Sequence, residues 1–250
     1  MVESESLNSG DLLNHVSLDC VIFGFHENEL KVLTLRLKTT KEYALPGGFV
    51  HKDEPLESAA KRVLKERTGL DNIFLKQFKV FSDPLRSRNN PAVKDLIELK
   101  AETDTSFFDQ RFISVGFYAL VEFTEVNPTP DFLSDSCLWT NVKDEIRFMM
   151  DHNKIINEAL DVLRVQLNYQ PIGYNLLPEK FTMPELQKLY ETILGKELDR
   201  RNFQRKILSY GILDKLNERR HGGAHKSPFL YKFNLKNYQS ALNEGLSGGW

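Results

Sequence analysis

The chain has 250 residues, of which 41% are hydrophobic and 27% charged, and its formal net charge is −2. This composition is that of a folded globular protein with room for one large or two smaller domains, and it excludes wholesale disorder. No apolar run approaches the roughly 20 residues of a membrane-spanning helix, and the acidic N-terminal residues lack the order of a secretory signal. We therefore expect a cytoplasmic protein without a membrane partner, whose cysteines, Cys20 and Cys137, are reduced core residues.

The charges are unevenly distributed along the chain. Residues 180–250 hold 13 Lys and Arg against 7 Asp and Glu, whereas residues 1–179 hold 20 against 28. A basic segment joined to an acidic body is typical of a protein with a nucleic-acid-binding arm. Chance segregation of solvated charges is the alternative that composition leaves open.

After a flexible N-terminus (residues 1–14), the first part of the chain predicts a β-rich domain. Residues 19–37 predict two strands around a polar turn, and residues 72–81 and 111–123 predict two more, because they are rich in aromatic and β-branched residues. Residues 82–110 form a long polar segment between strands, which predicts a functional lid or a partly disordered insertion.

Two amphipathic helices accompany these strands. The first follows a glycine turn, and its apolar side chains recur at helical spacing on one face: Leu56, Ala59, Ala60, Val63 and Leu64. Gly69 is placed to end it. The second helix covers residues 151–167, with Asp151 as the expected cap.

The last part of the chain predicts a separate small domain. Residues 169–180, with Pro171, Gly173 and Pro178, are the expected interdomain linker, and residues 241–250 a flexible tail. Residues 181–240 predict a helix over 183–194, a break at Gly195, a second helix over 199–213 capped by Asp199, and two short strands around Gly222 and Gly223. This order is that of a winged helix-turn-helix.

Residues 45–70 carry the most specific motif of the chain. Its fixed positions are Gly48, Glu54, Arg62, Leu64, Glu66, Gly69 and Leu70. This pattern of 23 positions resembles the Nudix box, G-x5-E-x7-R-E-U-x-E-E-x-G-U, where U is apolar. The resemblance implies an α/β Nudix domain, an α/β/α sandwich, over residues 15–168.

Two acids of that motif are missing. In active Nudix enzymes, the resemblance implies, acids at the positions of Val63, Glu66 and Arg67 hold a divalent metal ion. Here Val63 has no lone pair to offer, and the charge of Arg67 repels a cation. We therefore expect no catalytic residue, no required cofactor, and at most Glu66 as a metal ligand.

The loop and helix of the motif are nevertheless expected to keep a ligand pocket. The predicted ligand-binding residues are Gly47, Gly48, Glu54, Arg62, Glu66 and Arg67. The two glycines permit close approach of the backbone to a ligand. Glu54 and Arg62 either contact the ligand or brace the loop against the helix, and the sequence leaves both readings open.

Ten residues of the second domain are predicted to contact DNA, on the second helix and around the glycine tip: Arg200, Arg201, Asn202, Arg205, Lys206, Arg219, Arg220, His221, His225 and Lys226. Arginine suits guanine and asparagine suits adenine, whereas lysine suits phosphate. A lone basic residue is most often a solvated surface charge, but ten on two adjacent elements indicate DNA. His221 and His225 do not predict a zinc site, because no cysteine lies near them.

The combination of an incomplete Nudix box with a winged helix, over residues 15–236, resembles the bacterial Nudix-related transcriptional regulators. Residues 176–208 carry this resemblance as strongly as the Nudix box does. It implies a catalytically degenerate Nudix domain that senses a sugar or a nucleotide sugar such as ADP-ribose, and a winged helix that binds a palindromic DNA operator as a homodimer. The insertion over 82–110 departs from the compact pattern of that group and is expected to remodel the mouth of the pocket.

Two other functions stay open at this stage. The first is a Mg²⁺-dependent hydrolase of nucleoside-diphosphate-linked compounds, whose metal site combines Glu54 and Glu66 with acids of the insertion: Asp95, Glu98, Glu102, Asp104 or Asp109. The second is a protein-interaction module in which the basic domain binds an acidic partner.

Overall fold

The computed structural model describes residues 9–71, 73–88, 90–99, 105–220 and 227–245. The chain forms two compact units, one with residues 1–23 and 31–159, the other with residues 24–30 and 160–250. Within the described ranges, no helix combines the length and the apolar character needed to cross a membrane. The predicted domain boundaries stay a prediction.

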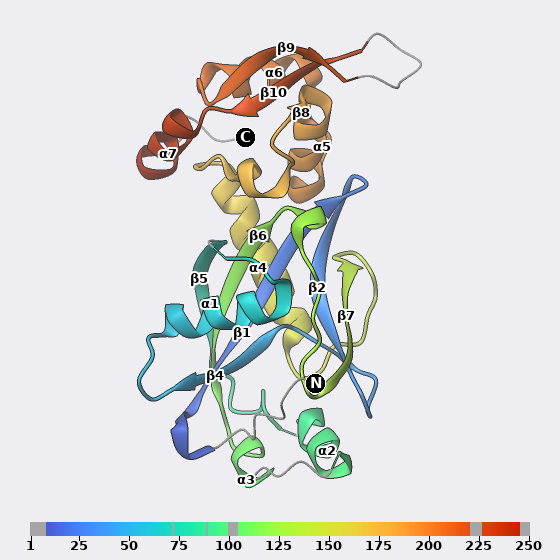
Figure 1. Cartoon of the computed structure of the whole chain (residues 1–250), viewed down its shortest axis with the longest axis vertical. Coiled ribbons are helices and arrows are strands. Elements are labelled where there is room, and N and C mark those ends of the chain that lie inside the picture. Colours follow the sequence, from blue (N-terminus) through green and yellow to red (C-terminus); the bar gives the residue numbers. More distant parts are fainter. Residues whose placement is uncertain (1–8, 72, 89, 100–104, 221–226, 246–250) are drawn as a thin grey trace. The chain divides into compact units, whose positions relative to one another are not determined.

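A β-sheet forms the centre of the first unit (Figure 1). Its strands in the described part of the chain are β1 (Leu12–His26), β2 (Glu29–Leu37), β3 (Tyr43–Ala44), β4 (Gly47–His51), β5 (Phe74–Phe81), β6 (Ile113–Val121) and β7 (Ser134–Asn141). Their order is β3-β2-β1-β6-β5, with β4 paired to β1 and β7 paired to β2. Glu27 and Asn28 join β1 to β2 with positive φ angles of 51° and 64°, as a tight hairpin turn requires.

Helices cover both faces of this sheet, as the predicted α/β/α sandwich requires. Helix α1 (Leu56–Thr68) lies on one face and the first half of α4 (His152–Leu167) on the other (Figure 1). The predicted apolar face of α1 is confirmed: its residues pack into the core with Leu18, Cys20 and Ile22 of β1. Asp19 lies between these residues in the sequence and therefore points to the opposite face.

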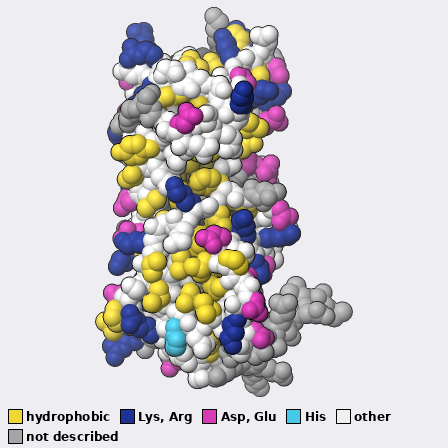
Figure 2. Space-filling view, turned by 90° about the vertical axis from the view of Figure 1, so that its left-hand side faces the viewer, with side chains coloured by type: hydrophobic (Ala, Val, Ile, Leu, Met, Phe, Trp, Pro, Cys, Tyr) yellow, Lys and Arg dark blue, Asp and Glu magenta, His cyan; other side chains and the backbone are white. Residues whose placement is uncertain are grey.

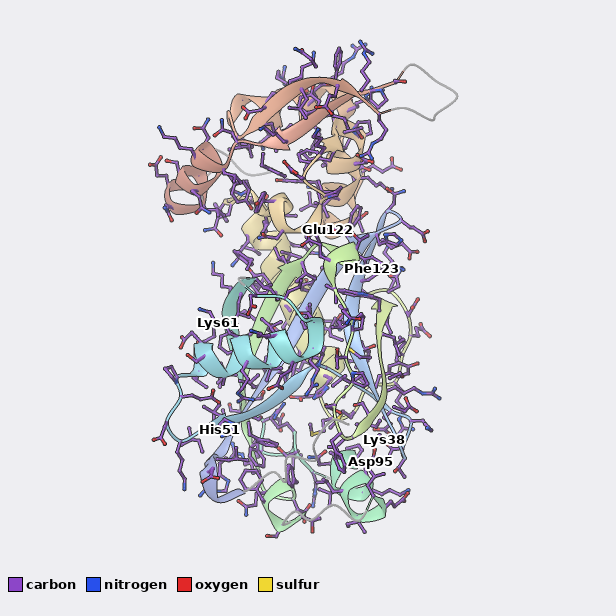
Figure 3. All side chains as sticks on the ribbon, in the orientation of Figure 1. Lys38, His51, Lys61, Asp95, Glu122 and Phe123 are labelled. Carbon is purple, nitrogen blue, oxygen red and sulfur yellow. The ribbon has the colours of Figure 1, made fainter. Side chains whose placement is uncertain are left out.

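In its described residues, the insertion over 82–110 holds two helices, α2 (Pro91–Glu98) and α3 (Thr105–Phe108), and its role as a lid stays a prediction. The rings of Phe107 and Phe108 lie 5.3 Å from that of Phe49, next to Gly48, and bury this aromatic cluster. The buried carboxylate of Asp95 accepts hydrogen bonds from the backbone of Thr39 and Thr40, each at 3.2 Å, which fixes α2 beside Lys38 (Figure 3).

The second unit has the predicted winged-helix order. It comprises the end of α4, the 3₁₀ helix η3 (Ile172–Leu176), β8 (Phe181–Thr182), α5 (Met183–Leu194), α6 (Arg200–Ser209), β9 (Leu213–Arg219), β10 (Phe229–Phe233) and α7 (Leu235–Glu244). Two further 3₁₀ helices in the first unit are η1 (Ser9–Asp11) and η2 (Phe123–Glu125). Gly195 ends α5 with a φ of 68°, and the side chain of Asp199 accepts from the backbone of Asn202, so both predicted helix boundaries are confirmed.

Three details differ from the sequence-based expectation. The segment predicted as a linker holds η3, because Ile172, Leu176 and Leu177 are apolar enough to be buried. Residues 241–244 form the last turn of α7 rather than a flexible tail. Helix α6 ends at Ser209 instead of residue 213, because Gly211 has a φ of 64° and β9 follows directly.

The surface mixes charge and apolar side chains. Basic and acidic residues are interspersed over the face shown in Figure 2, and hydrophobic side chains gather over its lower part. Exposed large apolar residues near strand ends of the first unit include Leu13, Val80 and Ile113. Scattered apolar residues of this kind are normal on a folded protein.

Candidate ligand site and candidate nucleic-acid interface

The two glycines of the box serve close packing inside the first unit. Gly47 pairs with Asp19 and Gly48 with Leu18 across the β4–β1 ladder. A Cβ atom on Gly47 would lie 2.7 Å from the carbonyl oxygen of Leu18, and one on Gly48 would lie 3.1 Å from Cγ2 of Val63. The lack of room for a side chain explains why glycine occurs at both positions, without any role in ligand binding. The predicted ligand contact stays a prediction.

Glu54 and Arg62 brace the loop against α1. Arg62 Nη2 donates to Glu54 Oε1 at 2.6 Å and to the carbonyl oxygen of Phe49 at 2.9 Å, while Glu54 Oε1 also accepts from the backbone N–H of His51 at 2.9 Å. Burial alone would raise the pKa of Glu54, but the bonds from Arg62 and His51 outweigh it and hold that pKa below its ordinary value. The geometry shows the bracing role, and ligand contact by Glu54 and Arg62 stays a prediction.

The three positions at which the family motif has metal-binding acids have different surroundings. Val63 is buried in the core under Gly48. The carboxylate of Glu66 lies between two guanidinium groups, with Oε1 3.6 Å from Arg62 Nη1 and Oε2 3.6 Å from Arg67 Nη2. The side chain of Arg67 is only 14% exposed, and its buried Nε has no hydrogen-bond partner among the described residues.

A divalent metal ion does not fit this arrangement. Mg²⁺ requires several oxygen ligands in near-octahedral geometry. Glu54 and Glu66 are both paired with guanidinium groups, and in the described ranges no group of three or more His, Cys, Asp or Glu side chains is placed to hold a metal.

The acids of the insertion do not rebuild such a site in the part of the chain that is described. Asp95 is bonded to the β2–β3 turn, and Glu98 pairs with Lys94 at 3.7 Å. Asp109 lines an open groove of about 500 Å³ beside α2, whose other lining residues are Thr40, Asn90, Pro91, Val93, Lys94, Ile97 and Glu98. Glu102 and Asp104 lie outside the described residues.

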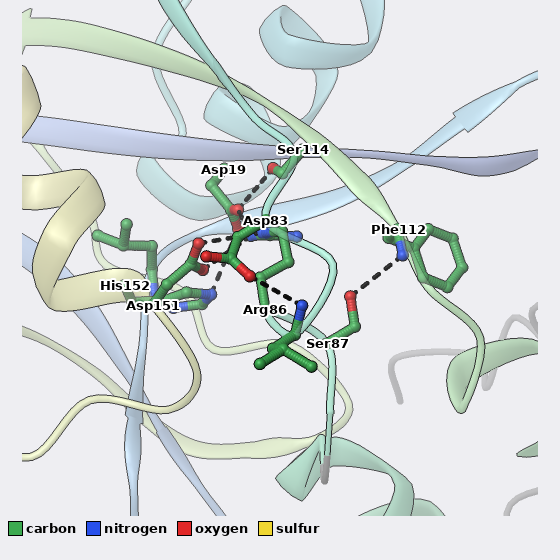
Figure 4. A network of polar contacts seen from close by, with 10 residues as sticks. Asp19, Asp83, Arg86, Ser87, Phe112, Ser114, Asp151 and His152 are labelled. Atoms are coloured by element: carbon green, nitrogen blue, oxygen red, sulfur yellow. Dashed lines mark hydrogen bonds and ion pairs between the residues drawn. The ribbon is translucent and has the colours of Figure 1, made fainter.

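A buried polar network under the box loop was missed by the sequence analysis (Figure 4). Arg86 is 2% exposed and donates to Asp19 at 3.1 Å and to both carboxylate oxygens of Asp151 at 3.0 and 3.1 Å. Ser114 donates to the same oxygen of Asp19 at 2.6 Å. Burial lowers the pKa of His152, whose Nδ1 accepts from the backbone of Leu45 at 2.9 Å. An arginine in a polar loop gives no sequence signal for burial.

Helix α6, the second helix of the winged helix-turn-helix, exposes most of its basic residues to solvent. Arg200, Arg201, Asn202 and Arg205 are exposed on α6, and Arg205 donates to Asn202 at 3.0 Å. Lys206 is half-buried. Its pKa is lowered mainly by burial and, to a smaller extent, by repulsion from Lys196. The helix therefore brings five of the ten predicted DNA contacts together on one element.

The predicted wing residues are partly engaged within the protein. The guanidinium of Arg219 lies 3.9 Å from the centre of the Phe229 ring, and Lys215 lies 3.8 Å from it. Arg220 pairs with Glu185 at 3.0 Å, which ties the residue after β9 to the start of α5. His221, His225 and Lys226 lie outside the described residues.

Comparison with known proteins gives matches over both units. The model of the NUDIX domain family matches residues 13–159, and that of the NrtR DNA-binding winged helix domain matches residues 173–233. The chain is 25% identical over 230 residues to the ADPR responsive transcriptional repressor NtrR of Acinetobacter baylyi, covering 89% of this chain and 83% of the relative.

Two solved structures share the fold. The crystal structure of Shewanella oneidensis NrtR complexed with a 27mer DNA matches with a TM-score of 0.73 and 22% identity, covering 95% of this chain and all of that one. A MutT/nudix family protein from Enterococcus faecalis matches with a TM-score of 0.64 and 21% identity, covering 89% and 87% of the two chains. At these identities the structural likeness shows the fold.

Proposed function

This chain belongs to the NUDIX domain family, and we propose that it is a DNA-binding transcriptional regulator whose Nudix domain senses a nucleotide sugar. The single observation that carries the proposal is the pairing of Glu54 and Glu66 with arginines, beside a buried Val63, in a chain that also has a winged helix. A receptor must release its ligand unchanged, so a Nudix scaffold without its metal-binding acids suits sensing and does not suit hydrolysis.

DNA binding is supported by the exposed basic side chains of α6. In a winged helix the N-terminal residues of the second helix reach base edges in the major groove, and Arg200, Arg201 and Asn202 occupy those positions. The match to the NrtR DNA-binding winged helix model supports the same role. We expect double-stranded DNA with a palindromic operator, read by a homodimer in the cytoplasm.

The effector is proposed to be ADP-ribose or a close nucleotide sugar. The support is the likeness over most of the chain to the ADPR responsive transcriptional repressor of A. baylyi. Repression is accordingly the expected direction of regulation. An effector changes DNA affinity only as far as it binds two conformations of the protein differently.

The test of DNA binding is selection of duplexes from a random pool by the full chain at ~0.15 M salt, near physiological ionic strength. We expect recovery of a palindrome whose half-sites lie about 10 base pairs apart. Salt-sensitive binding without any sequence preference would instead favour the protein-interaction module, and release of phosphate products from ADP-ribose would favour the hydrolase.

A further inference from the structure

Arg67 is a nearly buried cation with unused hydrogen-bonding capacity. Its ion pair in the described part of the chain is with Glu66, and at 3.6 Å this pair is longer than a hydrogen bond. Its Nε is buried and has no partner among the described residues. Buried donors are normally satisfied, so the Nε–H of Arg67 has the capacity for a further acceptor.

The position of Arg67 is defined by its neighbours at the end of α1. Its carbonyl oxygen accepts from the backbone of Thr129 at 3.0 Å, which joins α1 to the segment after β6. Burial raises the pKa of the half-buried Cys137 thiol to about 11, and the charge of Arg67 opposes this rise. The guanidinium is therefore within electrostatic range of Cys137 on β7.

The charges around Arg67 can accommodate an anion. Glu54 holds Arg62 at 2.6 Å, whereas Glu66 lies 3.6 Å from each arginine and its side chain is 44% exposed. Glu66 can therefore turn toward solvent, which frees Nη2 of Arg67 for another acceptor. A guanidinium fork matches phosphate oxygens with two parallel hydrogen bonds, and its charge persists at all physiological pH values.

We propose that Arg67 takes the place of the divalent metal ion of this family and binds the diphosphate of the effector, so that effector binding needs no metal. The inference rests on the proposed function for the identity of the effector, whereas the anion site rests on the geometry of Arg67 alone. The proposal also gives the changed Nudix box a function in ligand binding, because the Arg67 guanidinium, which repels a metal ion, supplies the positive charge that a diphosphate requires.

The test is titration calorimetry of the full chain with ADP-ribose and, separately, with inorganic pyrophosphate, each in EDTA and in Mg²⁺. We expect both ligands to bind in EDTA, and Arg67→Gln to weaken both at least about tenfold, as expected for loss of a charge-assisted bidentate contact. Arg67→Lys should retain part of the affinity. Lys65→Gln is the matched control, because this exposed lysine of the same helix pairs with Asp71 instead.

The outcomes separate the two proposals. Binding of either ligand only in Mg²⁺, or binding in EDTA that Arg67→Gln leaves unchanged, would overturn the role of Arg67. Binding of pyrophosphate but not of ADP-ribose would leave the anion site standing and remove ADP-ribose as effector. Absence of binding of both ligands would overturn both proposals. Thermal unfolding of each variant establishes that a lost affinity is not lost folding.

Discussion

Arg86 and Asp151 form a two-bonded ion pair inside the Nudix domain, with Arg86 Nε 3.1 Å from Oδ2 and Nη2 3.0 Å from Oδ1. The pair joins the insertion to the residue before α4, the helix that runs on into the second unit. Through Asp19, which pairs with Gly47, Arg86 also reaches the box loop. One buried guanidinium thus connects the insertion, the sheet and the start of α4.

Removing this guanidinium should destabilise the domain strongly. Arg86→Gln leaves the carboxylates of Asp19 and Asp151 without their cation, and loss of one partner of a buried pair costs about 3–5 kcal/mol. Urea denaturation measures the change. The matched control is Arg88→Gln, because Arg88 is exposed two residues further along, and it should change the free energy of unfolding by less than about 0.5 kcal/mol. Equal effects of both variants would contradict the account.

Stability should fall as the pH drops below the ordinary pKa of histidine, about 6.5. Burial lowers the pKa of His152, so below that value the unfolded chain binds a proton that the folded chain does not. Between the pKa of His152 in the unfolded chain and its lower pKa in the folded chain, each unit of falling pH therefore lowers the free energy of unfolding by up to about 1.4 kcal/mol. Denaturation curves at a series of pH values check this slope.

His152→Asn serves as the comparison for this pH dependence. Asparagine keeps an acceptor for the backbone N–H of Leu45 but does not titrate, so the slope between neutral pH and the folded pKa should diminish. An unchanged slope would assign the pH dependence to other groups.

Restoring the acids of the box should not restore a metal site. Val63→Glu places a carboxylate in the core beneath Gly48, where an unpaired charge costs several kcal/mol. The double variant Val63→Glu, Arg67→Glu should therefore unfold at lower denaturant and should not cleave ADP-ribose to AMP and ribose 5-phosphate in Mg²⁺. Lys61→Glu, an exposed substitution on the same helix, should leave stability nearly unchanged. A stable and active double variant would show that Val63 can turn outward.

Substitution of Arg201 should weaken DNA binding more than substitution of Arg220. Arg201 is exposed on α6 and has no partner in the described residues, so Arg201→Ala should cost about 1–3 kcal/mol at one operator position and relax specificity there. Arg220 is paired with Glu185, so Arg220→Ala should weaken DNA binding less. Affinities for single-base operator variants measure both effects. A uniform loss across all sequences would make Arg201 a phosphate contact.

The elements with strong periodicity could be predicted from the sequence. The spacing of Ala59, Ala60 and Leu64 predicts the buried face of α1, and the glycine after α5 and the aspartate before α6 mark helix ends that the structure confirms. These signals are local, because caps and helical faces depend on residues within a few positions of each other.

Features that depend on distant contacts could not be predicted in this way. The sequence predicts Arg86 to be an exposed surface charge. It is buried because the fold places Asp19 and Asp151, each more than 60 residues away in the sequence, beside it. The bracing role of Arg62 and Glu54 likewise depends on the carbonyl of Phe49 and the backbone of His51, which the sequence does not place. Phe107 and Phe108 occur in a polar stretch, and only their contact with Phe49 shows that they belong to a core.

In the proposed function, one protein couples the binding of ADP-ribose to the binding of operator DNA. The most direct test is the affinity of the full chain for its selected operator, measured by fluorescence anisotropy with and without ADP-ribose in EDTA. We expect ADP-ribose to weaken operator binding about 5- to 150-fold, the usual range of coupling between two sites, and adenosine to have no effect. An operator affinity that does not change at saturating ADP-ribose would contradict the account.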